Sequence, residues 1–477
     1  LCDFFAEQYH KRVERQKKKD AGQFFTPVEV ARKVTELVKV KYDRNIRILD
    51  PGCGLGILSF SLIERICQIH KPETIEVDFY EIDPYSIIYL EKLIHHAKQL
   101  LDGIGITLLA NVHIEDFVFS SYERIWDKGL YATNDQSEKY DYVISNPPYF
   151  KLNGQDNRTK VSLAIASSQL NIYALFMLLS SYLIREEGQL LFITPRSFTS
   201  GKYFEKFREK LLSKVNLSSM VIFNSRRDAF SRDSVLQEVV ISSWLRQKVN
   251  TLEVESVTGQ DTSFTCTLNE QQFKLGSNDG HIILTPETDA QLQSIEIIHS
   301  FNNKLSDLDW SISTGPVVSY RMSINLKNEV SDDFDFTKLF WLPDVQRFSI
   351  KHNRSQGKKE PYILLNDDTE RFLIKNNDMI FLRRFSAKGD KHRLVSAPYL
   401  STSTSERFIG VENRLNYLYK DSLKPNLDEL YGISALLNSS LYENYFRAMN
   451  GNVNVSATEI RLFRFPSIET IERIGSL

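Results

Sequence analysis

The sequence predicts an α/β fold for the first half of the chain, built on a Rossmann-like, mostly parallel sheet with an antiparallel edge. Three observations predict it. Strand-like and helical segments alternate over residues 46–245, a glycine-rich loop follows the first strand, and the second strand ends on acidic residues. From about Asn250 the pattern changes to short irregular segments rich in Ser, Thr, Asn and Asp, which predict a mixed α+β second domain.

Length and composition are those of a soluble protein with two or three domains. The chain has 477 residues, of which 42% are hydrophobic and 25% charged. We predict a basic helix over residues 1–20, an α/β domain over 21–249 and a second domain over 250–477. No apolar run reaches the roughly 18 residues of a membrane span, and the four cysteines have no zinc or disulfide spacing. A cytoplasmic location without membrane contact is therefore expected.

The net charge of −2 does not indicate nucleic-acid binding, but it conceals a local excess. From Val345 to Arg393 there are about 12 Lys or Arg and about 6 Asp or Glu. Within this stretch, Phe381–Lys388 interleaves arginines with aromatic residues, which suits contacts with phosphates or bases. A strand with one basic face explains the same pattern equally well.

The N-terminal residues lead into the first predicted helix of the α/β domain. The basic residues of the 1–20 segment are expected on a solvated helix face or in contact with phosphate. Gly22–Pro27 follows, and then Val28–Val40 has apolar residues at helical spacing. Thr26 and Pro27 are predicted to form the N-cap and first turn of this helix.

A glycine-rich loop joins the first predicted strand to a helix. Ile46–Asp50 reads as a strand, Pro51–Gly56 as the loop, and Ile57–Ile69 as the helix. Such glycines allow a tight turn and a close approach of a ligand to the main chain. A second strand, Ile75–Tyr80, ends in Glu81–Pro84, where a carboxylate suits ribose hydroxyls. Together these elements predict a nucleoside-binding site.

The residues around the loop narrow the choice of ligand. Asp50 directly precedes the loop, and an anion there repels a pyrophosphate but attracts a cationic or amine-bearing ligand. S-adenosylmethionine carries both an amino group and a sulfonium, so it is favoured over NAD. Asp116 follows a third predicted strand beside Phe117, where it suits an adenine amine, although an ordinary helix-cap or turn Asp is the alternative.

The stretch Asp141–Tyr149 has the chemistry of an amine-binding notch. Its first residues read as a strand that ends near Ser145, because consecutive prolines cannot continue a ladder. Asn146 supplies a side-chain carbonyl, and Pro147 supplies a main-chain carbonyl without an N–H. With the ring of Tyr149, these acceptors suit a planar exocyclic amine. An ordinary strand-to-loop turn is the plain alternative.

The rest of the α/β domain is predicted to contain a mobile polar loop over 150–168, then further helices and strands. Leu217–Phe223 and Val235–Leu245 read as adjacent strands, which predict the antiparallel edge. In the second domain, Leu427–Met449 reads as one helix.

The ordered set of motifs resembles the gamma-class N6-adenine DNA methyltransferases of restriction-modification systems, including the TaqI and PstI types. The motifs span roughly residues 20–245: Gly22–Pro27, Asp50–Gly56, Glu81–Pro84, Asp116–Phe117 and Asn146–Tyr149. In the second half, Arg383–Lys388 and Leu436–Ser439 look like segments common in the PstI type. The resemblance implies a Rossmann-like S-adenosylmethionine-dependent methyltransferase domain followed by a DNA target recognition domain.

The resemblance also implies roles for individual residues. Cofactor binding is expected from Thr26, Asp50, Gly52, Gly54, Gly56, Glu81, Asp116 and Phe117. The catalytic tetrad would be Asn146, Pro147, Pro148 and Tyr149, with no metal required. Contacts with the flipped adenine or the DNA are expected from Tyr149, Phe230, Arg383, Arg384 and Lys388. The implied partners are double-stranded DNA and a separately encoded restriction endonuclease, and the implied state is a monomer.

Other functions remain open at this point. Asn-Pro-Pro-Tyr also suits protein-glutamine and RNA methyltransferases, although more than 200 residues after the first domain favour DNA. Methylation of cytosine N4 more often pairs with Ser at the position of Asn146. A bifunctional restriction enzyme or an inactive binding subunit is the remaining alternative, but the sequence has no convincing nuclease constellation of paired carboxylates and lysine.

Overall fold

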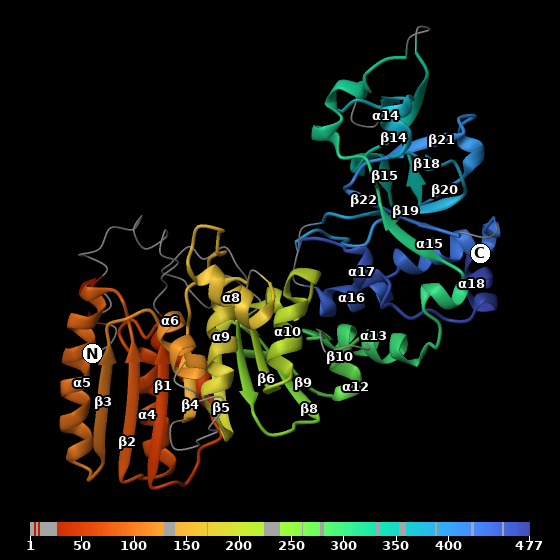
Figure 1. The fold of residues 1–477 in the computed structure, drawn as a ribbon. Helices are drawn as coiled ribbons and strands as arrows, with labels where there is room; N and C mark the ends of the chain where they lie inside the picture. The colour runs from red at the N-terminus through yellow and green to blue at the C-terminus, as the bar shows by residue number, and fades with distance from the viewer. Residues whose placement is uncertain are drawn as a thin grey trace. The chain divides into compact units, whose positions relative to one another are not determined.

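The computed structural model describes residues 4–5, 8–9, 26–127, 139–168, 170–223, 239–259, 261–276, 281–330, 334–352, 359–386, 389–420, 424–450 and 453–477. The chain divides into two compact units (Figure 1). The first contains Leu1–Thr199 and Tyr203–Glu287, and the second contains Ser200–Lys202 and Thr288–Leu477. The predicted basic helix over 1–20 lies largely outside the described residues. No described helix is long and apolar enough to cross a membrane.

The first unit is built on a nine-stranded sheet with the order β3-β2-β1-β4-β5-β7-β6-β8-β9. The strands are β1 Asn45–Pro51, β2 Thr74–Tyr80, β3 Thr107–His113, β4 Tyr140–Ser145, β5 Ile184–Pro195, β6 Asn216–Phe223, β7 Val239–Leu245, β8 Thr251–Thr258 and β9 Asp261–Asn269. The pairs among β1 to β5 are parallel, and β7 runs antiparallel to both β5 and β6. The predicted mostly parallel sheet with antiparallel pairing is therefore present.

The sheet continues beyond the boundary predicted at residue 250. Strand β8 pairs in parallel with β6, and β9 pairs antiparallel with β8. The two units divide at Glu287 and Thr288. The polar residues of β8 and β9 suggested a change of domain, but most of them occupy the exposed positions of strands that alternate between buried and exposed side chains.

One helix precedes the strands of the parallel part and the others follow them. They are α3 Val28–Glu36, α4 Ile57–Ile69, α5 Pro84–Asp102, α6 Phe117–Tyr122, α8 Arg158–Ala166, α9 Ile172–Leu183 and α10 Glu205–Leu212. Helix α8 lies within the segment predicted to be a mobile loop. The turn before α8 is organised by Asn153, whose Oδ1 accepts hydrogen bonds from the main-chain N–H groups of Gln155 (2.9 Å) and Asp156 (3.0 Å).

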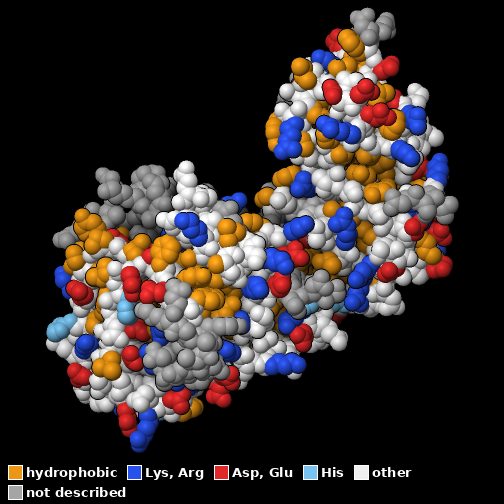
Figure 2. All heavy atoms as spheres, viewed as in Figure 1, with side chains coloured by type: hydrophobic (Ala, Val, Ile, Leu, Met, Phe, Trp, Pro, Cys, Tyr) orange, Lys and Arg blue, Asp and Glu red, His pale blue; other side chains and the backbone are white. Residues whose placement is uncertain are grey.

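The second unit contains mixed α and β structure. Its four-stranded sheet has the order β12-β22-β19-β20, from β12 Ser311–Thr314, β22 Leu415–Tyr419, β19 Met379–Arg383 and β20 Ser396–Tyr399. Its five-stranded sheet has the order β13-β17-β14-β21-β18, from β13 Leu326–Lys327, β17 Tyr362–Leu364, β14 Phe336–Phe340, β21 Phe408–Val411 and β18 Ile374–Lys375. Figure 2 shows Lys and Arg side chains scattered among apolar ones over the visible face of this unit.

The helix predicted over Leu427–Met449 is two helices, α15 (Leu427–Leu437) and α16 (Ser440–Met449). Ser439 separates them, because its side chain accepts from the N–H of Tyr442 (3.3 Å) and caps α16. Helix α15 packs closely on α18 (Ile468–Gly475). A Cβ on Gly432 would lie 2.0 Å from the carbonyl oxygen of Ile471, so this crossing requires glycine.

Candidate active site

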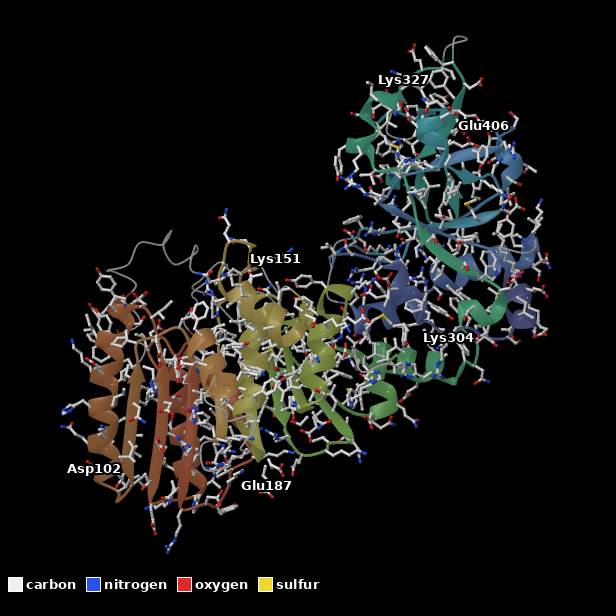
Figure 3. All side chains as sticks on the ribbon, in the orientation of Figure 1. Asp102, Lys151, Glu187, Lys304, Lys327 and Glu406 are labelled. Atoms are coloured by element: carbon white, nitrogen blue, oxygen red, sulfur yellow. The ribbon has the colours of Figure 1, made fainter. Side chains whose placement is uncertain are left out.

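A cavity of about 460 Å³ lies in the first unit where the strands β1, β2, β3 and β4 end. Figure 3 shows Lys151, from the segment after β4, at the opposite end of the sheet from Asp102 and Glu187. Nine predicted residues line the cavity: Thr26, Asp50, Gly52, Gly54, Glu81, Asp116, Phe117, Asn146 and Pro148. Segments far apart in the sequence therefore meet at one site, as expected at the carboxyl ends of parallel strands.

The glycine loop has the backbone that its sequence predicts. Gly52, Gly54 and Gly56 have φ values of 70°, 55° and 75°, a region that side chains disfavour. Gly56 was predicted to contact the cofactor, but it is not among the residues that line the cavity. A Cβ there would lie 2.8 Å from Leu90 Cδ1 and 2.9 Å from Phe60 Cε2, so Gly56 serves the packing of α4.

Asp50 is a buried carboxylate with one uncommitted oxygen. Its Oδ2 accepts from Ser59 Oγ at 2.6 Å, whereas Oδ1 has no hydrogen-bond partner among the described residues. Burial raises the pKa of Asp50 to about 7, although the hydrogen bond from Ser59 acts in the opposite direction. A buried carboxylate oxygen without a donor is costly, and a cationic or N–H-bearing ligand in the cavity would satisfy it.

Glu81 is held by the main chain around the cavity. Its Oε2 accepts from the N–H of Gly54, and its Oε1 accepts from those of Ile82 and Asp83, each at 2.8 Å. Burial raises the pKa of Glu81 despite these three bonds. Glu81 therefore joins the glycine loop to the end of β2, and its remaining acceptor capacity is available to ligand hydroxyl groups.

Asp116 is both a helix cap and a residue of the cavity wall. It is the N-cap of α6, with Oδ1 accepting from the N–H of Val118 at 2.8 Å, and it also lines the cavity. Its Oδ2 lies 3.6 Å from Arg158 Nη1. Phe117 is buried, and its ring lies 5.0 Å from that of Phe176 and 5.4 Å from that of Tyr80, measured between centroids. These rings form an aromatic wall suited to a flat heterocycle.

Asn146 stands beside the cavity and is fixed by contacts at both ends of its amide. Its Nδ2 donates to Thr26 Oγ1 at 3.1 Å. Thr26 was predicted to cap α3, but Pro27 is the N-cap and no side chain caps it. Instead, Thr26 holds the Asn146 amide across 120 positions of sequence. This contact joins the motif before α3 to the motif after β4.

Tyr149 is arranged differently from the prediction. Its hydroxyl donates to Asn146 Oδ1 and to the carbonyl oxygen of Ile193 (3.0 Å), and its ring packs edge-on to Tyr173. Neither Tyr149 nor Pro147 lines the cavity. The oxygen predicted to receive an amine hydrogen therefore already accepts the Tyr149 hydroxyl. Burial raises the pKa of Tyr149 well above its ordinary value, so the hydroxyl keeps its proton.

Sequence reasoning missed Arg158, the only cationic side chain among the described residues that line the cavity. Its Nη2 lies 2.7 Å from Asp156 Oδ2, and its guanidinium lies 5.2 Å from the centroid of the Phe150 ring. The hydrogen bond with Asp156 raises the pKa of Arg158. A basic residue shortly after the Asn146–Tyr149 motif was visible in the sequence, but only the fold brings it to Asp116.

Comparison with known proteins shows what the chain is similar to. Residues 83–230 match the model of the Eco57I restriction-modification methylase family. Over 474 residues the chain is 29% identical to the Type II methyltransferase M.BsuBI of Bacillus subtilis. This alignment covers 96% of this chain and 92% of that relative. Over 483 residues it is 27% identical to the Type II methyltransferase M.PstI of Providencia stuartii. This alignment covers 100% of this chain and 93% of that relative.

The chain is therefore similar to restriction-modification methylases along nearly its whole length.

Similarity to solved structures is weaker. The Type IIL restriction-modification enzyme MmeI, solved in complex with DNA, matches 98% of this chain over 65% of its own, at 11% identity and a TM-score of 0.47. Among the described residues, no group of three or more His, Cys, Asp or Glu side chains could hold a metal ion.

The predicted DNA-contacting residues divide into two groups. Phe230 and Lys388 lie outside the described residues. Arg383 and Arg384 belong to the second unit, and both use their guanidinium groups inside the fold: Arg383 Nε donates to the carbonyl oxygen of Val345 (2.8 Å) and Arg384 Nη1 to that of Asn413 (2.8 Å). Arg384 also stacks on Phe385, 5.7 Å from the ring centroid.

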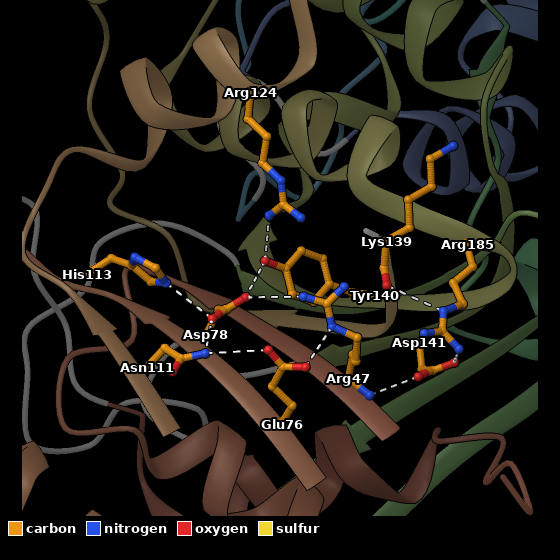
Figure 4. A network of polar contacts seen from close by, with 10 residues as sticks. All are labelled: Arg47, Glu76, Asp78, Asn111, His113, Arg124, Lys139, Tyr140, Asp141 and Arg185. Atoms are coloured by element: carbon orange, nitrogen blue, oxygen red, sulfur yellow. Dashed lines mark hydrogen bonds and ion pairs between the residues drawn. The ribbon is translucent and has the colours of Figure 1, made fainter. Parts of the chain in front are cut away.

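A charged network within the sheet supports the strands that carry the site (Figure 4). Asp78 of β2 accepts from His113 (3.1 Å), Asn111 (2.9 Å) and the hydroxyl of Tyr140 (2.5 Å). Burial alone would raise the pKa of Asp78, but these hydrogen bonds outweigh it and lower the pKa to about 2. The His113 ring also stacks on Tyr80, which lines the cavity, at a centroid distance of 4.5 Å.

This network predicts a pH-dependent contribution to stability. The hydrogen bond with Asp78 raises the pKa of His113 above its ordinary value. The protonated pair therefore stabilises the fold fully below about pH 6.5 and loses this contribution as the pH rises through the raised pKa. Urea unfolding should show His113→Gln to be less stable than the wild type at pH 6, by under about 1 kcal/mol because the ring is partly exposed. The difference should shrink at pH 8, and an unchanged difference would contradict this role.

Proposed function

We propose that the methylase transfers a methyl group from S-adenosylmethionine to N6 of an adenine in duplex DNA, at a specific site, as the protective half of a type II restriction system. The observation that carries the proposal is the fixed amide of Asn146 beside a cavity that also contains the glycine loop and Asp50. The similarity to Type II methyltransferases along the whole chain supports it.

The residues of the cavity fit S-adenosylmethionine. Asp50 Oδ1, which is buried and has no described partner, suits the ammonium of the methionine part. Glu81 suits the ribose hydroxyls, and Asp116 with the wall at Phe117 suits the adenine. The carboxylates of the cavity exceed its one described cation, Arg158, so a positively charged ligand is favoured. The cofactor supplies a methyl group activated by the sulfonium.

The roles of the tetrad follow from the hydrogen bonds that an exocyclic amine can make. Asn146 Oδ1 and the Pro147 carbonyl would each accept one N6 hydrogen, which draws the nitrogen out of the ring plane and localises its lone pair. Before its ring can stack on the base, Tyr149 must give up the hydrogen bonds of its hydroxyl with Asn146 Oδ1 and the Ile193 carbonyl and leave its packing against Tyr173. A paired adenine cannot reach the cavity, so the base must rotate out at a cost of a few kcal/mol.

The second unit would supply contacts with DNA. Its positive stretch, from Val345 to Arg393, suits phosphates, and binding should weaken steeply with salt. Arg384 remains a proposed contact, because the residue is only half-buried even though it bonds to Asn413. The recognition sequence would be read by a few side chains in this unit.

A labelling experiment tests the proposal. The protein is incubated with tritiated S-adenosylmethionine and plasmid DNA, with and without magnesium, beside parallel samples of RNA and of cell protein. Label in the DNA without cleavage, recovered as N6-methyladenine after enzymatic digestion and mass spectrometry, is the expected result. Label as N4-methylcytosine, or label only in RNA or protein, would overturn the choice of substrate, and magnesium-dependent cleavage would indicate a bifunctional enzyme.

A further inference from the structure

A tight hairpin in the second unit holds a phenylalanine in an unusual conformation. Strands β15 (Val345–Gln346) and β16 (Ser349–Ile350) pair antiparallel, and Arg347 and Phe348 form the tip between them. Phe348 has a φ of 64°, and 52% of its surface is exposed. A bulky residue rarely adopts this conformation, and an exposed aromatic ring gains little from it by packing. Such a position points to a function of the side chain itself.

The tip is anchored from three directions. The N–H of Phe348 donates to the carbonyl oxygen of Ser396 at 2.9 Å, and Arg347 Nη2 donates to that of Asn438 at 2.7 Å. At the base of the hairpin, Arg383 Nε donates to the carbonyl oxygen of Val345 at 2.8 Å, and the Val345 side chain is fully buried. The main chain is therefore fixed while the Phe348 ring is presented to solvent.

Both sequence segments singled out in the second half converge on this tip. Arg383 belongs to the first segment, Arg383–Lys388, and Asn438 to the second, Leu436–Ser439. The Asn438 side chain accepts from the N–H of Ser396 (3.1 Å) and donates to its carbonyl oxygen (2.8 Å), the same oxygen that receives the Phe348 N–H. The buried Asn438 amide thus holds the Ser396 main chain, to which the Phe348 N–H is bonded.

The surroundings of the ring favour nucleic acid over a protein partner. The Arg347 guanidinium lies 5.5 Å from the centroid of the Phe348 ring, and it also contacts His392 at 3.3 Å. The side chains of Lys351 and Lys391, which are neighbours in sequence of these residues, are exposed. An exposed aromatic ring beside a guanidinium, with exposed lysines nearby in the sequence, suits bases and phosphates together, whereas lysine is depleted in protein interfaces.

We propose that Phe348 is a wedge that inserts between stacked bases of the DNA, with Arg347 beside it. The inference rests on the proposed function, because it takes duplex DNA as the substrate. Inserted apolar side chains unstack and kink the duplex, and a rigid main chain is needed to transmit the force. A wedge in the second unit would lower the cost of taking a base out of the duplex.

Phe348→Gly separates this role from a structural one. Glycine adopts a φ of 64° without strain, so the melting temperature should not fall, while the ring is lost. The KM for DNA in the tritium assay, with sheared bacteriophage DNA as the probe, should rise about tenfold, the scale of one lost stacking contact, while the KM for the cofactor stays unchanged. Phe348→Asn, which also tolerates this backbone, should behave in the same way, and Phe348→Tyr should retain activity.

Two controls decide the outcome. Tyr320 is also exposed (74%) beside a stacked arginine, Arg321, but its φ is not positive, so Tyr320→Ala should leave the KM for DNA unchanged. The second control measures unwinding, by closing a nicked plasmid with ligase while equal fractions of the plasmid are bound by each protein. The wild type should unwind the plasmid more than Phe348→Gly does. If Phe348→Gly has an unchanged KM for DNA and unwinds the plasmid as the wild type does, the wedge is wrong. The same holds if Tyr320→Ala raises the KM for DNA equally. It also holds if Phe348→Gly loses self-association and keeps its affinity for DNA. If the wild type labels no DNA, the proposed function fails instead.

Discussion

Asn146→Ala is expected to lower the rate of methyl transfer about 10³-fold, the scale of removing one preorganised polar group from an active site. The substitution removes the Oδ1 acceptor that would draw the amine nitrogen out of its ring plane. It also removes the contact with Thr26, but it leaves Asp50, Glu81 and Asp116 in place along the cavity. Single-turnover labelling measures the rate, and calorimetry with S-adenosylmethionine should show little change in cofactor affinity.

Tyr149→Phe is the matched control for this result. It removes the hydroxyl that occupies Asn146 Oδ1 and keeps the aromatic ring. Transfer should fall by less than about tenfold, because the acceptor and the stacking surface both remain. If Tyr149→Phe is as inactive as Asn146→Ala, the hydroxyl has a role in the chemistry. If Asn146→Ala loses cofactor affinity in proportion to its rate, the assignment of Asn146 to the substrate amine is wrong.

Local sequence signals predicted the parts of the site that local structure determines. The strand β1, the loop with Gly52 and Gly54, and the acidic ends of β2 and β3 lie where the sequence indicated, because each depends on residues close together in the chain. The predicted mostly parallel sheet rests on the same alternation of strands and helices. The boundary at residue 250 was wrong because half-exposed strands such as β8 have polar residues that resemble loops.

The features that the sequence did not predict depend on contacts between segments far apart in the chain. Nothing in the neighbourhood of Thr26 indicated that its hydroxyl would bind Asn146 rather than cap a helix. Gly56 has the left-handed backbone of the loop, but only the packing of Leu90 against it shows that it serves the helix interface. Arg158 approaches Asp116 because Asn153 organises the turn before α8, which composition alone suggested to be a mobile loop. Tertiary contacts decided each of these cases.

Asp50→Asn is expected to weaken S-adenosylmethionine binding about 10²-fold at pH 8, because the ammonium would lose a buried charged partner. The wild type should depend on pH in a defined direction. Burial raises the pKa of Asp50 to about 7, so the carboxyl is mostly ionised at pH 8 and mostly protonated at pH 6. Wild-type affinity should fall about tenfold between these values, in line with the loss of the ionised form. Asp50→Asn should show no such fall, as measured by calorimetry at both pH values.

The charge of Asp50 also gives a test of whether the variant is folded, and a way to shift the pH midpoint of cofactor affinity. In the free protein, ionised Asp50 is buried without a cation, so its folded pKa above the unfolded value costs stability as the pH rises towards 8. Asp50→Asn should therefore melt no lower than the wild type at pH 8, which separates lost binding from misfolding. Ser59 donates to Asp50 Oδ2 and holds the pKa down, so Ser59→Ala should shift the midpoint of cofactor affinity to higher pH. A midpoint that does not move would show that another group controls the pH dependence.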